Sequence, residues 1–327
     1  MNSHARFAAR AAQALGYGFR SLDGADGYLF EISDGVRTAA FPVGYATPYA
    51  LNRAHAYSLA RDKAFAARVL AEAGLATIPG RLFFVTDRQA AHRSPGRERA
   101  DALAWAAAEA VFPLFCKPNQ GSKGEFAEIV ADAAGFEAYL ARVAGFYDAV
   151  LVQPLLRGRE HRVLTLEGRA LCAYEKTPPM LLGDGRASVA ALIAAARGGW
   201  KPAAQLQPIE AYRARDRAGR ALGLDFVPAA GAQIMLEGRA NRAAGGDAAA
   251  IVTAVPPGLA EIATRAAAAL GLVFAGVDVF DLSPARAGEN LVIIEVNANP
   301  ALETLEAQGR FDLIETIWAA NFAAALT

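Results

Sequence analysis

The sequence is poor in the residues that build covalent or metal-bound scaffolds. Its 327 residues include only two cysteines, Cys116 and Cys172, and they form no CxxC pair. Both lie among apolar neighbours, so we expect two small buried thiols rather than a disulfide framework or a zinc site. Sparse cysteine of this kind is typical of a protein that works in a reducing compartment.

The chain also lacks a net charge and a long apolar run. Lysine plus arginine number 33 and aspartate plus glutamate number 33, so no global field draws the protein to nucleic acid. No uninterrupted apolar stretch approaches the roughly 20 residues of a membrane-spanning helix. The basic, alanine-rich stretch 4–15 superficially suits a transit peptide, but Phe7, Ala11 and Leu15 share one helical face. We interpret it as the first helix of a cytoplasmic protein with neither nucleic-acid nor membrane partners.

Apolar residues, by contrast, are abundant. Hydrophobic residues make up 54% of the chain and charged residues 20%, which is ample for packed cores, and the length favours two or three units. Apolar residues repeat at helical spacing over 58–74, which predicts one amphipathic helix ending at Gly74. Residues 198–231 show no readable pattern. Short strands and a hairpin are predicted at 112–117, 127–130, 149–153, 159–166 and 170–176.

Two apolar strands near the end of the chain carry the strongest chemical signal, AGVDVFD at 275–281 and IIEVNANP at 293–300. Residues two apart in a strand share a face, so Glu295 and Asn297 project together, and Asp278 reaches the same side if the strands pair. Two carboxylates and a carboxamide oxygen form an incomplete oxygen shell that suits Mg²⁺ and nucleotide phosphates. The alternative is a turn at a strand end in which Asp or Asn serves only as a cap. That alternative accounts for a single Asp or Asn, but less well for all three residues on adjacent strands.

This pair of segments resembles the metal-binding end of the ATP-grasp superfamily, which includes D-alanine–D-alanine ligase, glutathione synthetase and cyanophycin synthetase. The resemblance implies an α+β fold whose two lobes clasp ATP. It also implies that Asp278, Glu295 and Asn297 bind Mg²⁺ or Mn²⁺. Several members follow the metal-binding Asn with a Pro-Gly segment that shapes the acceptor pocket, whereas here Pro300 precedes Ala301. That departure concerns the identity of the substrate more than the ATP chemistry.

A loop of small residues follows an apolar strand in FCKPNQGSKG at 115–124. The GxxxxGK(S/T) spacing of a Walker A loop is absent, and alone the segment suggests a glycine turn. The resemblance implies instead that Lys117 contacts phosphate, together with the flexible-loop residues Gly121, Ser122 and Gly124. It assigns the same role to Lys63, which would otherwise be a solvated helix residue.

The segment VLVQPLLRGREHRV at 150–163 joins two strands through proline and glycine, which indicates a hinge between lobes. The resemblance implies that Glu160 binds the ribose hydroxyls and that adenine is contacted by Gln153, Leu155 and Leu156. Arg162 shares a strand face with Glu160. It either contacts phosphate or pairs with Glu160, and both readings stay open.

Two later segments complete the resemblance. Lys176 precedes a GDGRASV pattern, and Arg239 and Asn241 lie in GRANRAAGG at 238–246. The resemblance implies that Lys176 is directed at the nucleotide and that Arg239 and Asn241 face an acyl phosphate. Without it, Lys176 would be a surface lysine on a hairpin, and the other two would belong to an arginine-rich surface loop.

Five motifs in family order cover residues 58 to about 309. They divide the chain into a short N-terminal segment at 1–57, a lid lobe at 58–156 and a C-terminal lobe with the metal site at 157–327. The implied activity is that of an ATP-dependent, ADP-forming ligase, which joins the carboxylate and amine of small molecules or short peptides through an acyl phosphate. The resemblance implies a homodimer or a tetramer, and the oligomeric state stays open. The alternatives are an ATP-grasp kinase or synthetase that makes no amide, and a non-catalytic ATP-binding regulator.

Overall fold

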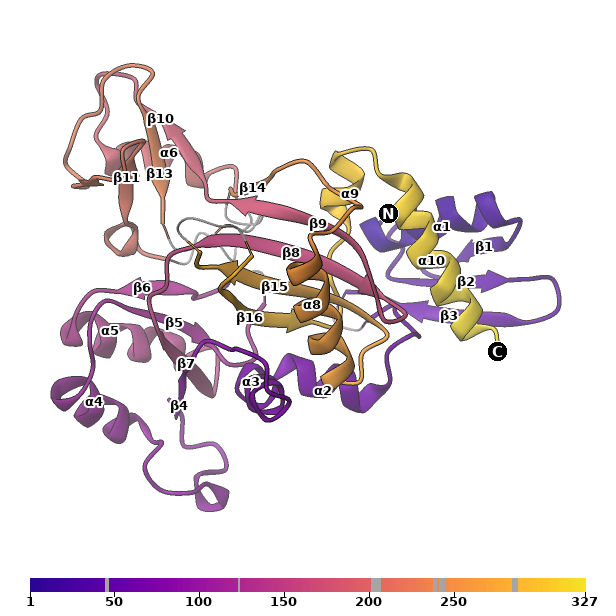
Figure 1. Ribbon diagram of the computed structural model, residues 1–327, viewed down its shortest axis with the longest axis horizontal. Helices are drawn as coiled ribbons and strands as arrows, with labels where there is room; N and C mark the ends of the chain where they lie inside the picture. Colours follow the sequence, from indigo (N-terminus) through magenta and orange to yellow (C-terminus); the bar gives the residue numbers. More distant parts are fainter. Residues whose placement is uncertain (45–46, 123, 201–206, 238–239, 241–244, 284–287) are drawn as a thin grey trace.

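The structure is a computed structural model, and it describes residues 1–44, 47–122, 124–200, 207–237, 240, 245–283 and 288–327. Within these ranges the strands form four antiparallel sheets, with helices packed against them (Figure 1). The fold is therefore the mixed α+β class that the sequence predicts. Among the described residues, no helix is both long and apolar enough to span a membrane.

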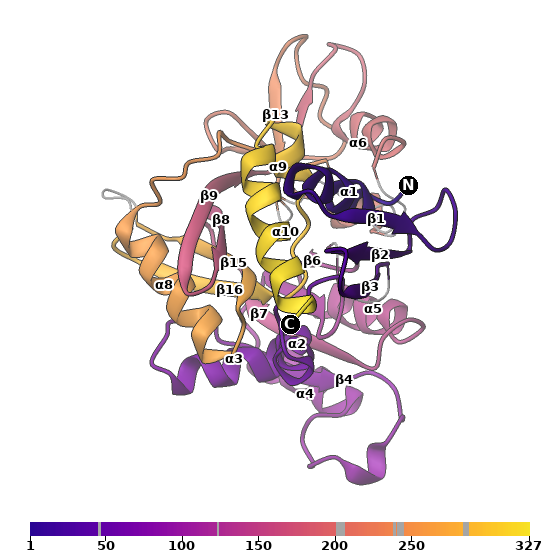
Figure 2. The same cartoon turned by 90° about the vertical axis from the view of Figure 1, so that its right-hand side faces the viewer.

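The N-terminal unit is a helix followed by a three-stranded sheet in the order β1-β2-β3. Its elements are α1 (Ser3–Leu15), β1 (Gly18–Ser21), β2 (Leu29–Ser33) and β3 (Thr38–Pro42). The predicted helix at 4–15 is confirmed, and Phe7 and Ala11 are buried on its inner face. That face packs along α10 (Phe311–Ala325), and the two helices lie side by side in Figure 2. The fully buried Trp318 of α10 stands in the shared core.

The single helix predicted over 58–74 is wrong, because the chain breaks at Asp62 into α2 (Ala54–Arg61) and α3 (Lys63–Glu72). Asp62 has an extended backbone, and its carboxylate accepts a hydrogen bond from the Phe65 N–H, so it caps α3 rather than continuing α2. The break makes Lys63 the first residue of a helix. The boundary expected between residues 57 and 58 falls inside α2, and the division into three units stays a prediction.

Residues 81–154 of the predicted lid lobe form a four-stranded sheet in the order β4-β7-β5-β6. Its elements are β4 (Arg81–Phe84), η1 (Ala90–His92), α4 (Arg99–Ala108), β5 (Leu114–Pro118), β6 (Glu128–Val130), α5 (Ala133–Val143) and β7 (Ala149–Pro154). The helices α4 and α5 cover one face, where Phe83, Phe136 and Leu140 are buried in a common core. Two links connect this lobe to the rest of the chain, since residues 73–80 lead into it from α3 and residues 155–158 lead out of it to β8.

The site is built on a five-stranded sheet in the order β14-β9-β8-β15-β16. The strands are β8 (Arg159–Leu166), β9 (Arg169–Thr177), β14 (Asp247–Ala248), β15 (Phe274–Asp281) and β16 (Leu291–Asn297). The predicted β8–β9 hairpin is confirmed, and Glu167 and Gly168 turn it with positive φ angles. One face packs on α8 (Pro257–Ala269) through Val163, Val277 and neighbouring apolar residues. Strand alternation therefore directs residues 160, 162 and 278 to the opposite face.

Residues 178–237, in their described parts, contribute a small protruding sheet (Figure 1). Its elements are β10 (Met180–Leu182), α6 (Val189–Arg197), η2 (Ile209–Ala211), β11 (Ala214–Asp216), β12 (Ala221–Leu222) and β13 (Gln233–Leu236). The GDGRASV pattern has a local structural role here. Asp184 accepts hydrogen bonds from the N–H groups of Arg186 and Ala187, and Ser188 caps α6.

Candidate functional site

Strand register brings the predicted metal residues to one face of the five-stranded sheet. Asp278 of β15 stands directly opposite Glu295 of β16, as the sequence requires if the strands pair. On its other side Asp278 stands opposite Arg162 of β8. Glu160, also of β8, stands opposite Lys176 of β9. Four neighbouring strands thus contribute charged side chains to a single surface.

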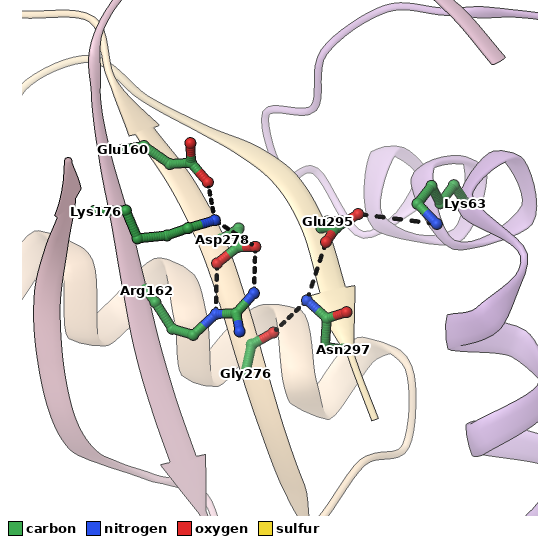
Figure 3. A network of polar contacts seen from close by, with 8 residues as sticks. All are labelled: Lys63, Glu160, Arg162, Lys176, Gly276, Asp278, Glu295 and Asn297. Carbon is green, nitrogen blue, oxygen red and sulfur yellow. Dashed lines mark hydrogen bonds and ion pairs between the residues drawn. The ribbon is translucent and has the colours of Figure 1, made fainter. Parts of the chain in front are cut away.

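Glu295 and Asn297 are neighbours on that surface, as strand alternation predicts (Figure 3). The Asn297 side-chain amide donates to Glu295 Oε1 at 3.2 Å and to the carbonyl oxygen of Gly276 at 3.5 Å. The ammonium group of Lys63, at the start of α3, lies 3.9 Å from Glu295 Oε2. Residues 232 positions apart in sequence, Lys63 and Glu295, therefore meet at this site.

Arg162 pairs with Asp278 and not with Glu160, so the pairing considered from the sequence is wrong. Its Nε lies 2.7 Å from Asp278 Oδ1, and its Nη2 lies 2.6 Å from Oδ2. The cause is the antiparallel register, which places residue 162 against residue 278 across two strands. Glu160 instead forms an ion pair with Lys176, whose ammonium is also 3.5 Å from Asp278 Oδ2. Only 11% of the Lys176 side chain is exposed, so it is not a surface lysine.

Burial and charge compete at Glu295. Burial alone would raise the pKa of its carboxyl group, but nearby cations outweigh that effect and lower the pKa to about 2. Those cations are Lys63, Lys117, Lys176 and Arg162. Together with Glu160 and Asp278, the network holds four cationic groups and three carboxylates. Such an excess of positive charge in a partly enclosed site attracts an anion.

Lys117 is the most enclosed of these cations, with 5% of its surface exposed at the end of β5. Burial lowers the pKa of its ammonium group, Glu295 opposes that shift, and Lys63 adds to it. The Lys117 ammonium group forms no hydrogen bond or ion pair with the residues that the structure describes. A buried cation without a partner is costly unless an anion joins it.

The residues around Glu295 suit a divalent cation in chemistry but do not enclose one. Two carboxylates and a carboxamide are the oxygen ligands that Mg²⁺ accepts. Both oxygens of Asp278 are held by Arg162, which leaves Glu295 and Asn297 as the more open pair. Among the described residues, no three His, Cys, Asp or Glu side chains are grouped so as to hold a metal. A cation here would need further oxygen ligands, such as those of a nucleotide.

The residues expected to contact nucleotide lie beside this network. Gly121 accepts a hydrogen bond from the Lys63 ammonium at 2.6 Å, and Ser122 and Gly124 follow in the same loop. Gln153 is 4% exposed and donates to the Ile78 carbonyl oxygen at 3.1 Å. Its Oε1 is buried without a hydrogen-bond partner in the described structure, and the side chain lines a small cavity shared with Lys63 and Glu295.

Of the remaining residues expected at the site, two are described by the structure and two are not. Leu155 and Leu156 are half-buried in the link that follows β7, and their contact with adenine stays a prediction. Arg239 and Asn241 lie outside the described residues. Their expected roles at the acyl phosphate stay predictions, as do the ligand contacts of the other residues.

Two buried asparagines support the site and were assigned no role from the sequence. Asn52 accepts hydrogen bonds from the N–H groups of Val273 and Phe274 and donates to the carbonyl oxygens of Phe274 and Ala298, so it ties the start of β15 to the end of β16. Asn119 connects the loop after β5 to α3. The groups that each asparagine contacts are distant from it in sequence. Only Asn119 could have been singled out from the sequence, because it directly follows Lys117 and Pro118.

Comparison with known proteins agrees with the fold and the motifs. The family described as RimK-like ATP-grasp domain matches residues 225–320. Cyanophycin synthetase of Nostoc sp. is 29% identical over 255 residues, which cover 74% of this chain and 26% of the relative. The bifunctional glutathione biosynthesis protein GshAB of Desulfotalea psychrophila is 26% identical over 249 residues, covering 74% of this chain and 31% of that protein. The chain thus spans roughly a quarter to a third of the length of these relatives.

A solved structure shows the same fold. The crystal structure of a bifunctional glutathione synthetase from Pasteurella multocida aligns with 98% of this chain and 44% of its own, with a TM-score of 0.52 and 18% identity. Identity that low establishes the fold and nothing further. The family match over the C-terminal strands and the shared fold lead to one conclusion: residues 225–320 match a RimK-like ATP-grasp domain, and the chain has the ATP-grasp fold.

Proposed function

We propose that the protein is an ATP-dependent carboxylate–amine ligase that forms an amide through an acyl phosphate and releases ADP and phosphate. The observation that carries the proposal is the cluster of Lys63, Lys117, Lys176 and Arg162 around Asp278 and Glu295. The relatives add support, because their names are those of enzymes that make peptide-like products.

Cation clustering suits phosphoryl transfer because that reaction needs positioning and charge neutralisation more than a protein nucleophile. In the first step a substrate carboxylate oxygen attacks the γ-phosphorus of ATP, and ADP leaves. In the second step an amine attacks the acyl carbon, and phosphate leaves. Lys117 and Lys63 would bind phosphate oxygens, and their partial burial strengthens that attraction because the surroundings screen charge less than water does.

Asp278, Glu295 and Asn297 would hold Mg²⁺ or Mn²⁺, which supplies Lewis-acid neutralisation of phosphate charge. Glu160 would accept hydrogen bonds from the ribose hydroxyls while Lys176 keeps its carboxylate in place. The proposed substrates are an amino acid or short peptide and an amine. A cytoplasmic location and a homodimer remain part of the proposal, and both cysteines are free and buried, as a reducing setting requires.

A hydroxylamine trap tests the proposal directly. The protein is incubated with ATP, Mg²⁺, hydroxylamine and a panel of amino acids and short peptides, and hydroxamate, ADP and AMP are quantified separately. Hydroxamate with stoichiometric ADP is the expected result, and it names the carboxylate substrate. The Glu295→Gln variant is the matched control and should give neither product.

Other outcomes separate the alternatives. AMP in place of ADP would replace the acyl phosphate with an acyl adenylate. ADP with a phosphorylated product and no hydroxamate would favour a kinase. ATP binding without turnover of any substrate in the panel would favour the non-catalytic regulator.

A further inference from the structure

The loop that follows β5 in the lid lobe is tied to the first turn of α3. The N–H of Lys63 donates to the Asn119 carbonyl oxygen at 3.2 Å, and the N–H of Ala64 donates to Asn119 Oδ1 at 2.9 Å. The Lys63 ammonium reaches Gly121 in the same loop. The amide of Gln120 lies 3.4 Å from Asp62 Oδ2. The lid lobe therefore supplies part of the N-terminal cap of a helix outside its own sheet.

Asn119 is hydrogen-bonded both to the lid sheet and to α3. It is 4% exposed, and its own N–H donates to the Ala149 carbonyl oxygen of β7 at 3.0 Å, which anchors it to the lid sheet. At the other end, α3 packs against β16 in the core beneath the site. The first N–H groups of a helix have no partner within the helix. Asp62 satisfies that of Phe65, and Asn119 satisfies those of Lys63 and Ala64.

The two lysines expected to bind phosphate lie in the two elements that Asn119 connects. Lys117 precedes Asn119 by two residues in β5, and Lys63 is the helix residue whose N–H Asn119 accepts. Both ammonium groups act on the Glu295 carboxylate and repel each other. Because the two ammonium groups repel each other, a connection between α3 and β5 is needed to hold them at a fixed distance. Asn119 supplies a direct hydrogen-bonded connection of this kind.

We propose that Asn119 is a positioning residue that sets the separation of Lys63 and Lys117, so that both ammonium groups meet the same phosphate chain of a nucleotide. The inference rests on the ATP binding of the proposed function but is independent of amide formation. If Asn119 served only the stability of α3, its substitution would lower the stability of the protein. Its effect on nucleotide affinity would then be independent of Lys63.

A double-mutant cycle on nucleotide affinity tests the proposal. Binding of ADP in the presence of Mg²⁺ is measured by isothermal titration calorimetry for wild type, Asn119→Ala, Lys63→Met and the double variant. We expect Asn119→Ala to weaken binding about tenfold, the equivalent of one charge-assisted hydrogen bond. In the Lys63→Met background the same change should have little further effect, because the group that it positions is gone.

Two further variants separate positioning from stability. Asn119→Ser keeps an uncharged side-chain oxygen of the kind that accepts from helix N–H groups, and it should lose less ADP affinity than Asn119→Ala. Asp132→Ala removes the cap of α5, where Asp132 accepts from the Gly135 N–H at 2.8 Å, and it should leave ADP affinity unchanged. A melting temperature measured for each variant shows that all are folded.

Additive losses in the cycle would overturn the proposal, as would equal losses from Asn119→Ala and Asp132→Ala. Wild type that binds no nucleotide would remove both the proposed function and this inference. Wild type that binds ADP and shows the coupling, yet forms no hydroxamate, would uphold the inference while the ligase proposal fails.

Discussion

Arg162 binds Asp278 through both arms of its guanidinium group, with N···O distances of 2.7 and 2.6 Å. Only 2% of the Asp278 side chain is exposed, so its charge depends on this partner and on Lys176. Removing one member of a buried ion pair leaves an uncompensated charge, whereas exposed pairs contribute little. The pair should therefore be central to the stability of the sheet.

Arg162→Met is expected to lower the free energy of unfolding by about 3 kcal/mol, measured by urea denaturation. Arg169→Met is the matched control, because Arg169 lies on the same hairpin and is largely exposed, with Glu167 4.0 Å away. That control should change stability by less than about 0.5 kcal/mol. Equal effects of the two substitutions would contradict the role that the geometry assigns to the Arg162–Asp278 pair.

Glu295→Gln should abolish ligase turnover while the protein stays folded. The substitution removes the charge on which Lys63 and Lys117 act and weakens a proposed metal ligand. We expect at least about a 100-fold loss of ADP formation with Mg²⁺, in line with the loss of one key electrostatic group. Glu261→Gln, on the exposed side of α8, is the control and should retain wild-type activity. Substantial Mg²⁺-dependent activity of Glu295→Gln would rule out the metal assignment.

Lys117→Met should bind ATP more weakly and yet be more stable. Burial lowers the pKa of Lys117, so the protonated form is less favourable in the folded than in the unfolded chain. That cost is present at pH values below the folded-state pKa of Lys117, and methionine removes it at similar side-chain length. We expect a higher melting temperature, together with at least about a tenfold loss of ATP affinity by calorimetry. Unchanged affinity would contradict the phosphate role.

Neither thiol should react in the native protein at pH 8. Burial raises the pKa of Cys172 to about 12 and that of Cys116 well above its usual value, so little thiolate exists to attack a reagent. Titration with a chromogenic disulfide should count no reactive thiol in native protein and both after denaturation. A fast-reacting thiol without denaturant would show that one of these residues is accessible.

Local patterns predicted the parts of the site that lie within one strand or its neighbour. The projection of Glu295 and Asn297 to one face follows from strand periodicity alone, and apolar strands on both sides of Asp278 indicated a paired sheet. The β8–β9 hairpin was readable because Gly168 supplies the required turn. Each of these features depends on a few adjacent residues.

Features that depend on distant contacts were not predictable from the pattern. The partner of Arg162 is set by the register between β8 and β15, and nothing near residue 162 encodes it. The break at Asp62 was hidden because neither glycine nor proline marks it, and only the folded chain shows that Asp62 accepts from the Phe65 N–H as the cap of a new helix. Asn52 and Asn119 are short polar residues in loops, and their importance comes from backbone groups that only the folded chain brings to them.

The first link of the lid lobe lies beside the end of β7, from which the second link leaves. In the first link Thr77 bridges Ile293 of β16, and Ile78 accepts the hydrogen bond from Gln153 that ends beside the second link. Once the hydrogen bonds between Asn119 and α3 are released, these two connections would favour rotation about an axis that runs through them. Displacement then grows with distance from that axis along the order β7-β5-β6, and β6 lies two strand spacings, about 10 Å, from β7. Gln153 thus lies near this axis, whereas the edge strand β6 lies farther from it.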